Sequence, residues 1–114
     1  MTPPDWAPRL VDAIERELAE RPAVVHVHWV RATSPEEVEV VYSDWANTER
    51  LGFRLSASLV QSAPWRIRDS SIDELAFDIR TTVICEPRAP DNFLPPDTNG
   101  VRWLPWSQWL EEVT

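Results

Sequence analysis

The residues that come closest to a metal site in this sequence are two histidines and one glutamate. His26 and His28 alternate with valines, so both imidazoles share one face if the segment is a strand. Imidazole nitrogens and carboxylate oxygens bind metals, and Glu39 in the next apolar segment supplies a third ligand if the two segments form a hairpin. The alternative is an ordinary cross-strand pair of His28 with Glu39 on a solvated face. We predict no bound metal and no cofactor, because the pattern lacks a fourth ligand and supporting hydrogen bonds.

The single cysteine, Cys85, is the candidate nucleophile. It falls at the end of a predicted helix and precedes Glu86, and both the helix dipole and the carboxylate favour the thiol over the reactive thiolate. We therefore expect a small packed hydrophobe at this position. The acidic residues fall on predicted polar faces and turns, where carboxylates are not tuned into separate acid and base roles. We predict that the protein is not an enzyme.

The composition excludes several common chemistries. The 114-residue chain has no lysine and only two glycines, Gly52 and Gly100, which excludes a Schiff-base lysine, a P-loop and a nucleophile elbow. The formal net charge of -8 argues against nucleic acids and anionic membranes as partners, because both attract clustered basic residues. No apolar run approaches the roughly 20 residues of a membrane span, and residues 1–5 do not resemble a signal peptide. A single cysteine suits a reducing compartment, so we expect a cytoplasmic location.

The strongest secondary-structure signal is a β-hairpin formed by residues 24–30 and 38–42. Apolar and polar residues alternate in both segments. The register of the two strands is then set by burial, because a slip of one residue would turn every apolar side chain to the solvent. Bringing the apolar faces together leaves residues 32–35 as the loop and sets His28 opposite Glu39. The predicted apolar pairs are Trp29 with Val38, Val27 with Val40, and Val25 with Tyr42, which places Trp29 in the core.

Further elements flank this hairpin. Residues 5–20 form a predicted amphipathic helix capped by Asp5, and residues 53–59 alternate as a third strand with one wet face. Ser71 and Glu74 form a capping box that starts another helix. We also expect an edge strand at 101–104 and a terminal helix from 105 to 113.

The predicted order is helix, three strands, helix and then a tail. This order describes a single α+β domain in which two helices cover a three-stranded antiparallel meander. The core spans residues 5–86, followed by a Pro-rich loop at 87–100 and a docked Trp-rich tail at 101–114 that ends in a short helix. Double-stranded RNA-binding domains share the order of elements, but they rely on a basic second helix, and here that helix is acidic.

Seven tryptophans are the compositional anomaly of the chain. Those of the tail either pack across the sheet or first helix, or leave one or two exposed as anchors, since Trp and Arg are enriched at interface hot spots. Trp45 and Trp65 lie in connecting segments, where functional residues are common. The acidic net charge favours a partner with a basic surface. The predicted partner-binding residues are Glu36, Glu37, Glu39, Glu74, Asp78, Trp45, Trp65 and Trp106.

Three classes of function remain open. The first, which we favour, is a small acidic protein-binding module of inhibitor, immunity or adaptor type that binds a basic partner stoichiometrically. The second is a ligand-binding, metal-binding or hydrolytic domain around His26, His28 and Glu39. The third is a structural homodimer subunit. We expect a monomer or homodimer with no nucleic-acid or membrane partner.

Overall fold

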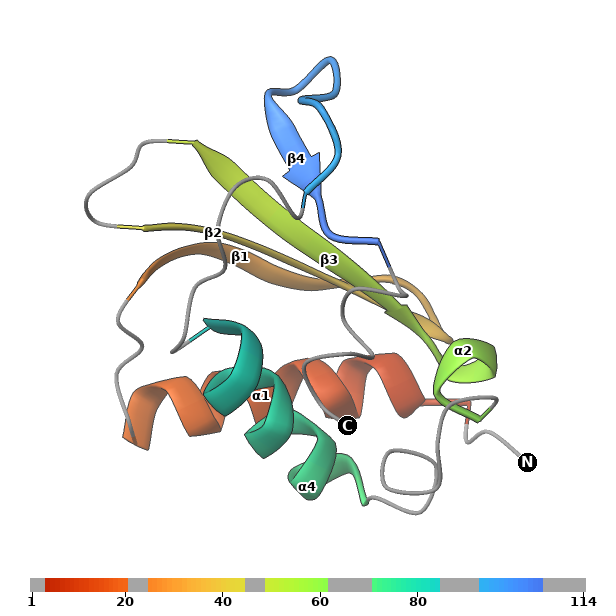
Figure 1. Cartoon of the computed structure of the whole chain (residues 1–114). Helices are drawn as coiled ribbons and strands as arrows, with labels where there is room; N and C mark the ends of the chain where they lie inside the picture. The colour runs from red at the N-terminus through yellow and green to blue at the C-terminus, as the bar shows by residue number, and fades with distance from the viewer. Residues whose placement is uncertain (1–3, 21–24, 45–48, 62–70, 85–92, 106–114) are drawn as a thin grey trace.

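The fold is α+β, as the sequence predicts. The computed structural model of the chain describes residues 4–20, 25–44, 49–61, 71–84 and 93–105. Within these ranges a helix is followed by three strands, then by short helices and a last strand (Figure 1). The elements are α1 (Trp6–Glu20), β1 (Val25–Ser34), β2 (Glu37–Asp44), β3 (Arg50–Ser56), α2 (Ala57–Gln61), α4 (Ile72–Asp78), the π-helical η1 (Ile79–Ile84) and β4 (Val101–Trp103).

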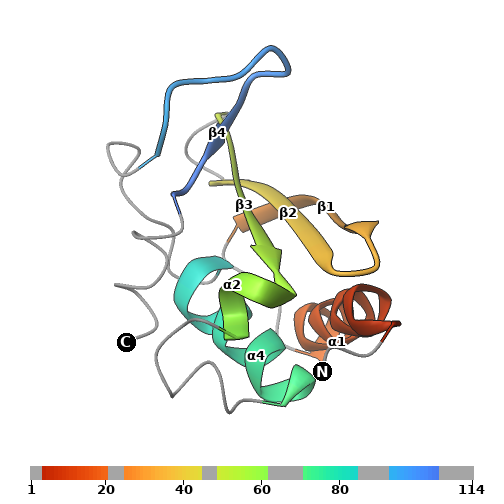
Figure 2. The ribbon, with the colours of Figure 1, turned by 90° about the vertical axis from the view of Figure 1, so that its right-hand side faces the viewer.

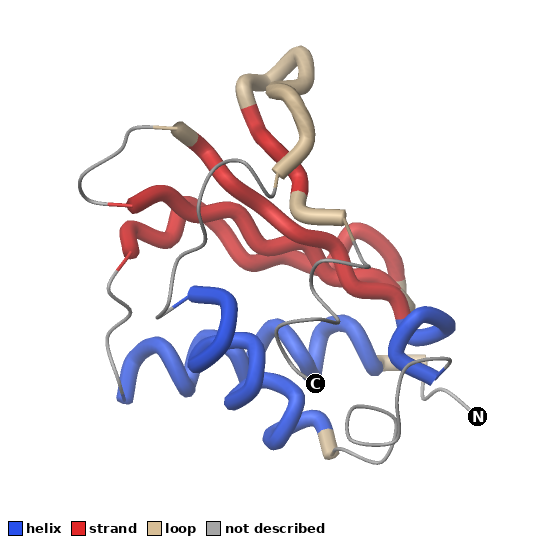
Figure 3. The backbone as a smooth tube through the Cα atoms, viewed as in Figure 1, coloured by secondary structure: helices blue, strands red, loops and turns tan. Residues whose placement is uncertain are grey.

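The sheet and the main helices form two layers. The strand order is β1-β2-β3-β4. β1, β2 and β3 are the predicted antiparallel meander, and β4 joins β3 in parallel. Helices α1 and α4 lie together beneath one face of the sheet (Figure 3), and the view turned by 90° shows the same two layers (Figure 2). We call the other side of the sheet the outer face.

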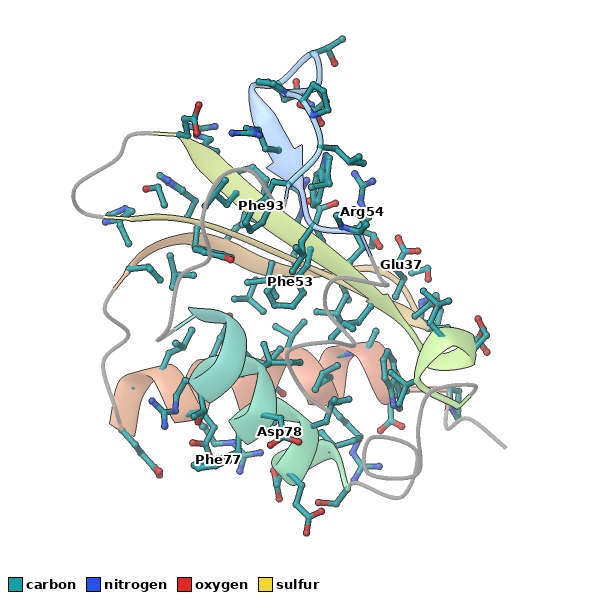
Figure 4. All side chains as sticks on the ribbon, viewed as in Figure 1. Glu37, Phe53, Arg54, Phe77, Asp78 and Phe93 are labelled. Carbon is teal, nitrogen blue, oxygen red and sulfur yellow. The ribbon has the colours of Figure 1, made fainter. Side chains whose placement is uncertain are left out.

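The core lies between the sheet and the two main helices. Leu10 and Ile14 of α1 are fully buried there, as their helical spacing predicts. Phe53 points from β3 toward the helices, whereas its neighbour Arg54 lies on the outer side (Figure 4). Tyr42 meets Phe53 edge to face, with 6.4 Å between the ring centroids. Other fully buried side chains of this core are Leu55, Ile79, Val38 and Val40.

β1 and β2 form the predicted hairpin, but the predicted register is wrong. The two strands are slid by two residues relative to the prediction at Val27, and residues 35–36 form the turn in place of residues 32–35. Arg31, and not His28, lies opposite Glu39. The observed pairs include Val25 with Asp44, His26 with Ser43, Val27 with Tyr42, Trp29 with Val41, Val30 with Val40, and Ser34 with Glu37.

A β-bulge at His28 turns Trp29 out of the core. Between the pairs made by Val27 and Trp29, β1 has one residue more than β2. The two residues of such a bulge, His28 and Trp29, leave the strand on the same side. Val30 then packs against the core instead. The predicted core position of Trp29 is wrong because the alternation that predicted it is interrupted at this bulge.

β3 is shorter than the strand predicted at residues 53–59. It ends at Ser56, and α2 begins at once with Ala57. The Ser56 hydroxyl accepts a hydrogen bond from the backbone N–H of Leu59 at 3.2 Å, which is the contact of a helix N-cap. The apolar residues beyond Ser56 therefore belong to a helical turn and not to the sheet.

The capping serine of α4 is confirmed. The Ser71 hydroxyl accepts a hydrogen bond from the backbone N–H of Glu74 at 3.2 Å. Leu75, Ala76 and Ile79 are buried on the face toward the core. Within the described parts of the chain, no helix is long and apolar enough to cross a membrane.

The beginning of the tail forms the predicted edge strand. Gly100 forms the turn before β4 with φ of 76°, a conformation that glycine adopts without steric cost. The backbone N–H of Leu104 donates to the Gly52 carbonyl at 2.7 Å, which fastens the end of β4 to β3. Residues 106–113 of the predicted terminal helix, together with Trp45, Trp65, Cys85 and Trp106, lie outside the described residues.

Candidate functional site

A row of charged side chains crosses the outer face of the sheet. Because β2 lies between β1 and β3, Glu39 is paired with Arg31 on one side and with Arg54 on the other. The Arg31 Nη2 lies 2.9 Å from Glu39 Oε1, and the Arg54 Nε lies 3.2 Å from Oε2. The Trp29 Nε1–H also donates to Glu39 Oε1, at 2.9 Å. One carboxylate therefore orients two guanidinium groups and one indole.

Glu39 is ionised in this setting. Its side chain is only 6% exposed, whereas Arg31 and Arg54 are 59% and 51% exposed. Burial alone would raise the pKa of Glu39, but the hydrogen bonds from Trp29, Arg54 and Arg31 and the charge of Arg31 outweigh burial and hold the pKa below its ordinary value. The carboxylate is thus a buried support for exposed cations.

Gly52 makes room for a second indole on the outer face. β4 pairs Trp103 with Gly52. A Cβ added to Gly52 would lie 2.9 Å from Trp103 Cζ3 and 3.0 Å from the Val40 carbonyl oxygen. The Trp103 ring therefore lies against the middle of β3, where any other residue would collide with it. The Arg54 guanidinium carbon lies 3.8 Å from the centroid of the same ring, within the range of a cation–π contact.

We predict that Gly52→Ala destabilises the fold by about 1–3 kcal/mol. The added methyl group meets the backbone at Val40 as well as Trp103, and backbone cannot move aside as a side chain can. Urea unfolding monitored by circular dichroism measures this loss. Ala57→Gly, at the buried start of α2, is a control that alters the chain away from Trp103. An unchanged unfolding midpoint for Gly52→Ala would contradict the close packing of Trp103 on β3.

Asp97 fixes the turn that carries Trp103. Its Oδ2 accepts a hydrogen bond from Trp103 Nε1 at 2.9 Å, and its Oδ1 accepts from the backbone N–H groups of Asn99 and Val101 at 2.8 and 3.0 Å. The hydrogen bond from Trp103, followed by that from Val101, lowers the pKa of Asp97. The carboxylate of Asp97 therefore stabilises this turn and the position of the Trp103 ring.

These side chains line a groove of about 370 Å³ that we call the Arg-Trp groove. Three arginines face two carboxylates in it, so the groove is locally cationic on an acidic chain. Among the described residues, the Arg50 side chain has no hydrogen bond and no ion pair, and its guanidinium carbon lies 6.0 Å from the centroid of the Trp29 ring. The lining residues are Trp29, Arg31, Glu39, Arg50, Arg54, Asp97, Asn99, Val101 and Trp103.

The two histidines lie near the groove but do not meet Glu39. The rings of His26 and His28 are 4.9 Å apart, and His28 Nε2 lies 3.0 Å from the Ser43 hydroxyl. Burial, then the charges of Arg50 and His26, lower the pKa of His28, which favours its neutral form. Glu39 is instead bound by two arginines. Over the described residues, no group of three or more His, Cys, Asp or Glu side chains could hold a metal ion.

The acidic residues predicted to bind a partner do not form one surface. Glu36 and Glu37 lie at the turn between β1 and β2, and Glu37 accepts a hydrogen bond from the Thr33 hydroxyl at 2.8 Å. The predicted place of Glu39 on a solvated face is wrong, because β2 is an inner strand and the Glu39 side chain is buried. Glu74 and Asp78 lie on α4, away from Glu37 (Figure 4).

The arginines of the groove are the residues that sequence reasoning did not single out. Arg50, Gly52 and Arg54 alternate along β3 and so share the outer face. Their spacing was visible in the sequence, as was the wet face of this strand. Arg31 could not be added to them, because its position opposite Glu39 depends on the bulge at His28.

Comparisons with known proteins found no match: no family model, no curated protein and no solved structure is significantly similar to this chain.

Proposed function

We propose that this chain is a non-catalytic binding module that holds a protein partner on the outer face of its sheet. The observation that carries the proposal is the Arg-Trp groove, in which Trp29 and Trp103 each contact a guanidinium group. Trp and Arg are the residues most enriched at interface hot spots. Glu39 and Asp97 already hold these side chains, so less conformational entropy is lost on binding. A cytoplasmic place of action, which the single cysteine favours, is part of the proposal.

A second candidate function is the binding of a basic protein partner, which the acidic net charge favours. It is supported by exposed carboxylates on the helical side of the molecule, which the salt bridge of Arg16 with Asp73 at 3.5 Å neutralises only in part. Such a surface attracts basic proteins over long range. The exposed acids on α1 and α4 are Asp12, Glu15, Glu20, Asp73 and Glu74. A ligand or metal site built on both histidines and Glu39 has less support, because Glu39 is occupied by Arg31 and Arg54.

Photo-crosslinking distinguishes the two surfaces. A benzophenone amino acid placed at Asn99 lies on the rim of the groove, and the same group at Glu15 lies on the exposed side of α1. In lysate of the source cells we expect an adduct of defined mass from the Asn99 position and none from Glu15. An adduct from Glu15 alone would move the contact to the acidic helices. No adduct from either position at low salt would contradict a binding module.

A further inference from the structure

The arginines of the groove have N–H donors that no described residue uses. The Arg54 Nε donates to Glu39, whereas its two Nη atoms make no hydrogen bond to any described residue. The guanidinium group of Arg50 makes no hydrogen bond within the described parts of the chain. A guanidinium group presents its N–H donors as a planar fork that matches the two oxygens of a carboxylate. The groove therefore presents oriented donors for anionic oxygen atoms.

The arginines of the groove already bind one carboxylate within the chain, that of Glu39. Arg31 reaches Glu39 Oε1 through both Nε and Nη2, at 3.2 and 2.9 Å. Arg54 approaches the other oxygen of the same carboxylate. Arg31 of β1 and Arg54 of β3 thus bind the same carboxylate from the two strands that flank β2. The Nη atoms of Arg54 remain available to bind the carboxylate of a ligand.

The tryptophans argue against nucleobases as the ligand. Single-stranded nucleic acids bind by stacking bases on bare aromatic faces. Here Arg31 lies 4.8 Å from the centroid of Trp29, and Arg54 lies 3.8 Å from that of Trp103. Both indole N–H groups are also used, by Glu39 and Asp97. The indoles therefore serve to position guanidinium groups more than to stack with a ligand.

The charge of the whole chain argues against a polyanion. A formal net charge of -8 repels the phosphate backbone of a nucleic acid over a distance of about 8–10 Å in physiological salt. An isolated carboxylate bound in direct contact with Arg50 or Arg54 gains a charge-assisted hydrogen bond that does not depend on long-range attraction. The groove thus suits a ligand with one or two carboxylates.

We propose that the Arg-Trp groove binds the carboxylate side chains of an acidic peptide segment of the partner. One carboxylate accepts from the Nη atoms of Arg54 and another contacts Arg50, while Trp29 and Trp103 keep the guanidinium groups of Arg31 and Arg54 in position. The proposal rests on the proposed function, because it names the partner of the same surface. It also reverses the charge expected of that partner.

Selection from a random library of acetylated heptapeptides on the immobilised full chain tests this proposal. We expect the retained peptides to be enriched in Asp and Glu. One retained peptide and its twin with Asn and Gln in place of the acids are then titrated into the ¹⁵N-labelled chain. The acidic peptide should shift the Nε1–H signals of Trp29 and Trp103, and the twin should bind at least about tenfold more weakly, the equivalent of one charge-assisted contact.

Matched variants link the effect to the groove. Arg50→Gln should weaken binding of the acidic peptide at least about fivefold, and its fold should persist because no described residue depends on Arg50 for a hydrogen bond. Arg9→Gln, on the exposed side of α1 and 4.0 Å from Asp5, should leave the affinity unchanged. Equal effects of the two variants would indicate general attraction between charges and overturn the site.

The other outcomes separate this proposal from the function on which it rests. Retention of basic or neutral peptides, or tighter binding of a ten-nucleotide oligothymidylate, with shifts at Trp29 and Trp103 would refute the acidic ligand and keep the groove as a binding surface. Failure of every peptide and of the oligonucleotide to shift either signal would also refute it. The crosslink at Asn99 would then decide whether the outer face binds any protein.

Discussion

Phe53→Ala should lower the free energy of unfolding by about 3–5 kcal/mol, more than any outer-face substitution. Phe53 is 1% exposed and lies in the core beside Tyr42, so the truncation leaves a cavity that a closely packed interior cannot fill. Trp29→Ala removes a larger ring, yet it should cost only about 1–3 kcal/mol. The reason is that Trp29 lies on the outer face, where it loses a hydrogen bond to Glu39 and only part of its burial.

Chemical unfolding followed by far-ultraviolet circular dichroism compares the two variants without relying on tryptophan fluorescence. Trp29→Phe serves as a control that keeps an aromatic ring at the bulge and removes only the N–H donor. A loss for Trp29→Ala equal to or greater than that for Phe53→Ala would return Trp29 to the core. It would also restore the unbroken alternation of β1.

The helices and the core-facing side of the sheet can be predicted from the sequence, because their apolar residues recur with the regular spacing of a helix or a strand. Leu10 and Ile14 recur at helical spacing, Ser71 caps a helix, and the alternation in β3 separates Phe53 from Arg54. Each of these signals is local and needs no knowledge of the rest of the chain. The α+β class and the antiparallel meander follow from them.

The outer face is less predictable because it depends on the register of β1 against β2 and on irregular residues in β1. Up to a second irregularity between Ala32 and Ser34, the extra residue at His28 shifts the following residues of β1 to the opposite side of the sheet. Nothing in the pattern of valines and histidines marks that bulge. The prediction paired Glu39 with His28 because it missed both this bulge and the two-residue slide of the strands, whereas the fold pairs Glu39 with Arg31. The sequence suggested Glu39 as a metal ligand beside two histidines, whereas in the structure its carboxylate lies between Arg31 and Arg54.

The same bulge connects stability with the proposed binding surface. It brings Trp29 and Arg31 to the side of the sheet that already carries Arg54, while Gly52 admits Trp103 from the tail. Residues from β1, β3 and β4 thus meet around Glu39 of β2. Changes at Glu39 should therefore affect both the stability of the sheet and the geometry of the groove.

Glu39→Gln should lower the free energy of unfolding at pH 7 by about 1.5–3 kcal/mol. The amide keeps the shape of the side chain but removes the charge that Arg31, Arg54 and Trp29 share. Urea unfolding of the two proteins measures the difference. Glu36→Gln is the matched control, because Glu36 is exposed at the turn and should change stability by no more than about 0.5 kcal/mol.

The pH dependence of this difference identifies its origin. The pKa of Glu39 is lower in the folded chain than its ordinary value of 4.5, so the unfolded chain takes up a proton first as the pH falls. The stabilisation by the Glu39 charge is complete above pH 4.5 and is lost as the pH falls through the lower folded value. The unfolding free energies of the natural chain and Glu39→Gln should therefore converge as the pH falls below 4.5 and through the lower folded pKa. A difference that stays constant over this range would mean that the shape of the side chain, and not its charge, supports the arginines. The groove would then keep its guanidinium groups in place without an internal anion, and its affinity for an acidic peptide would survive the substitution.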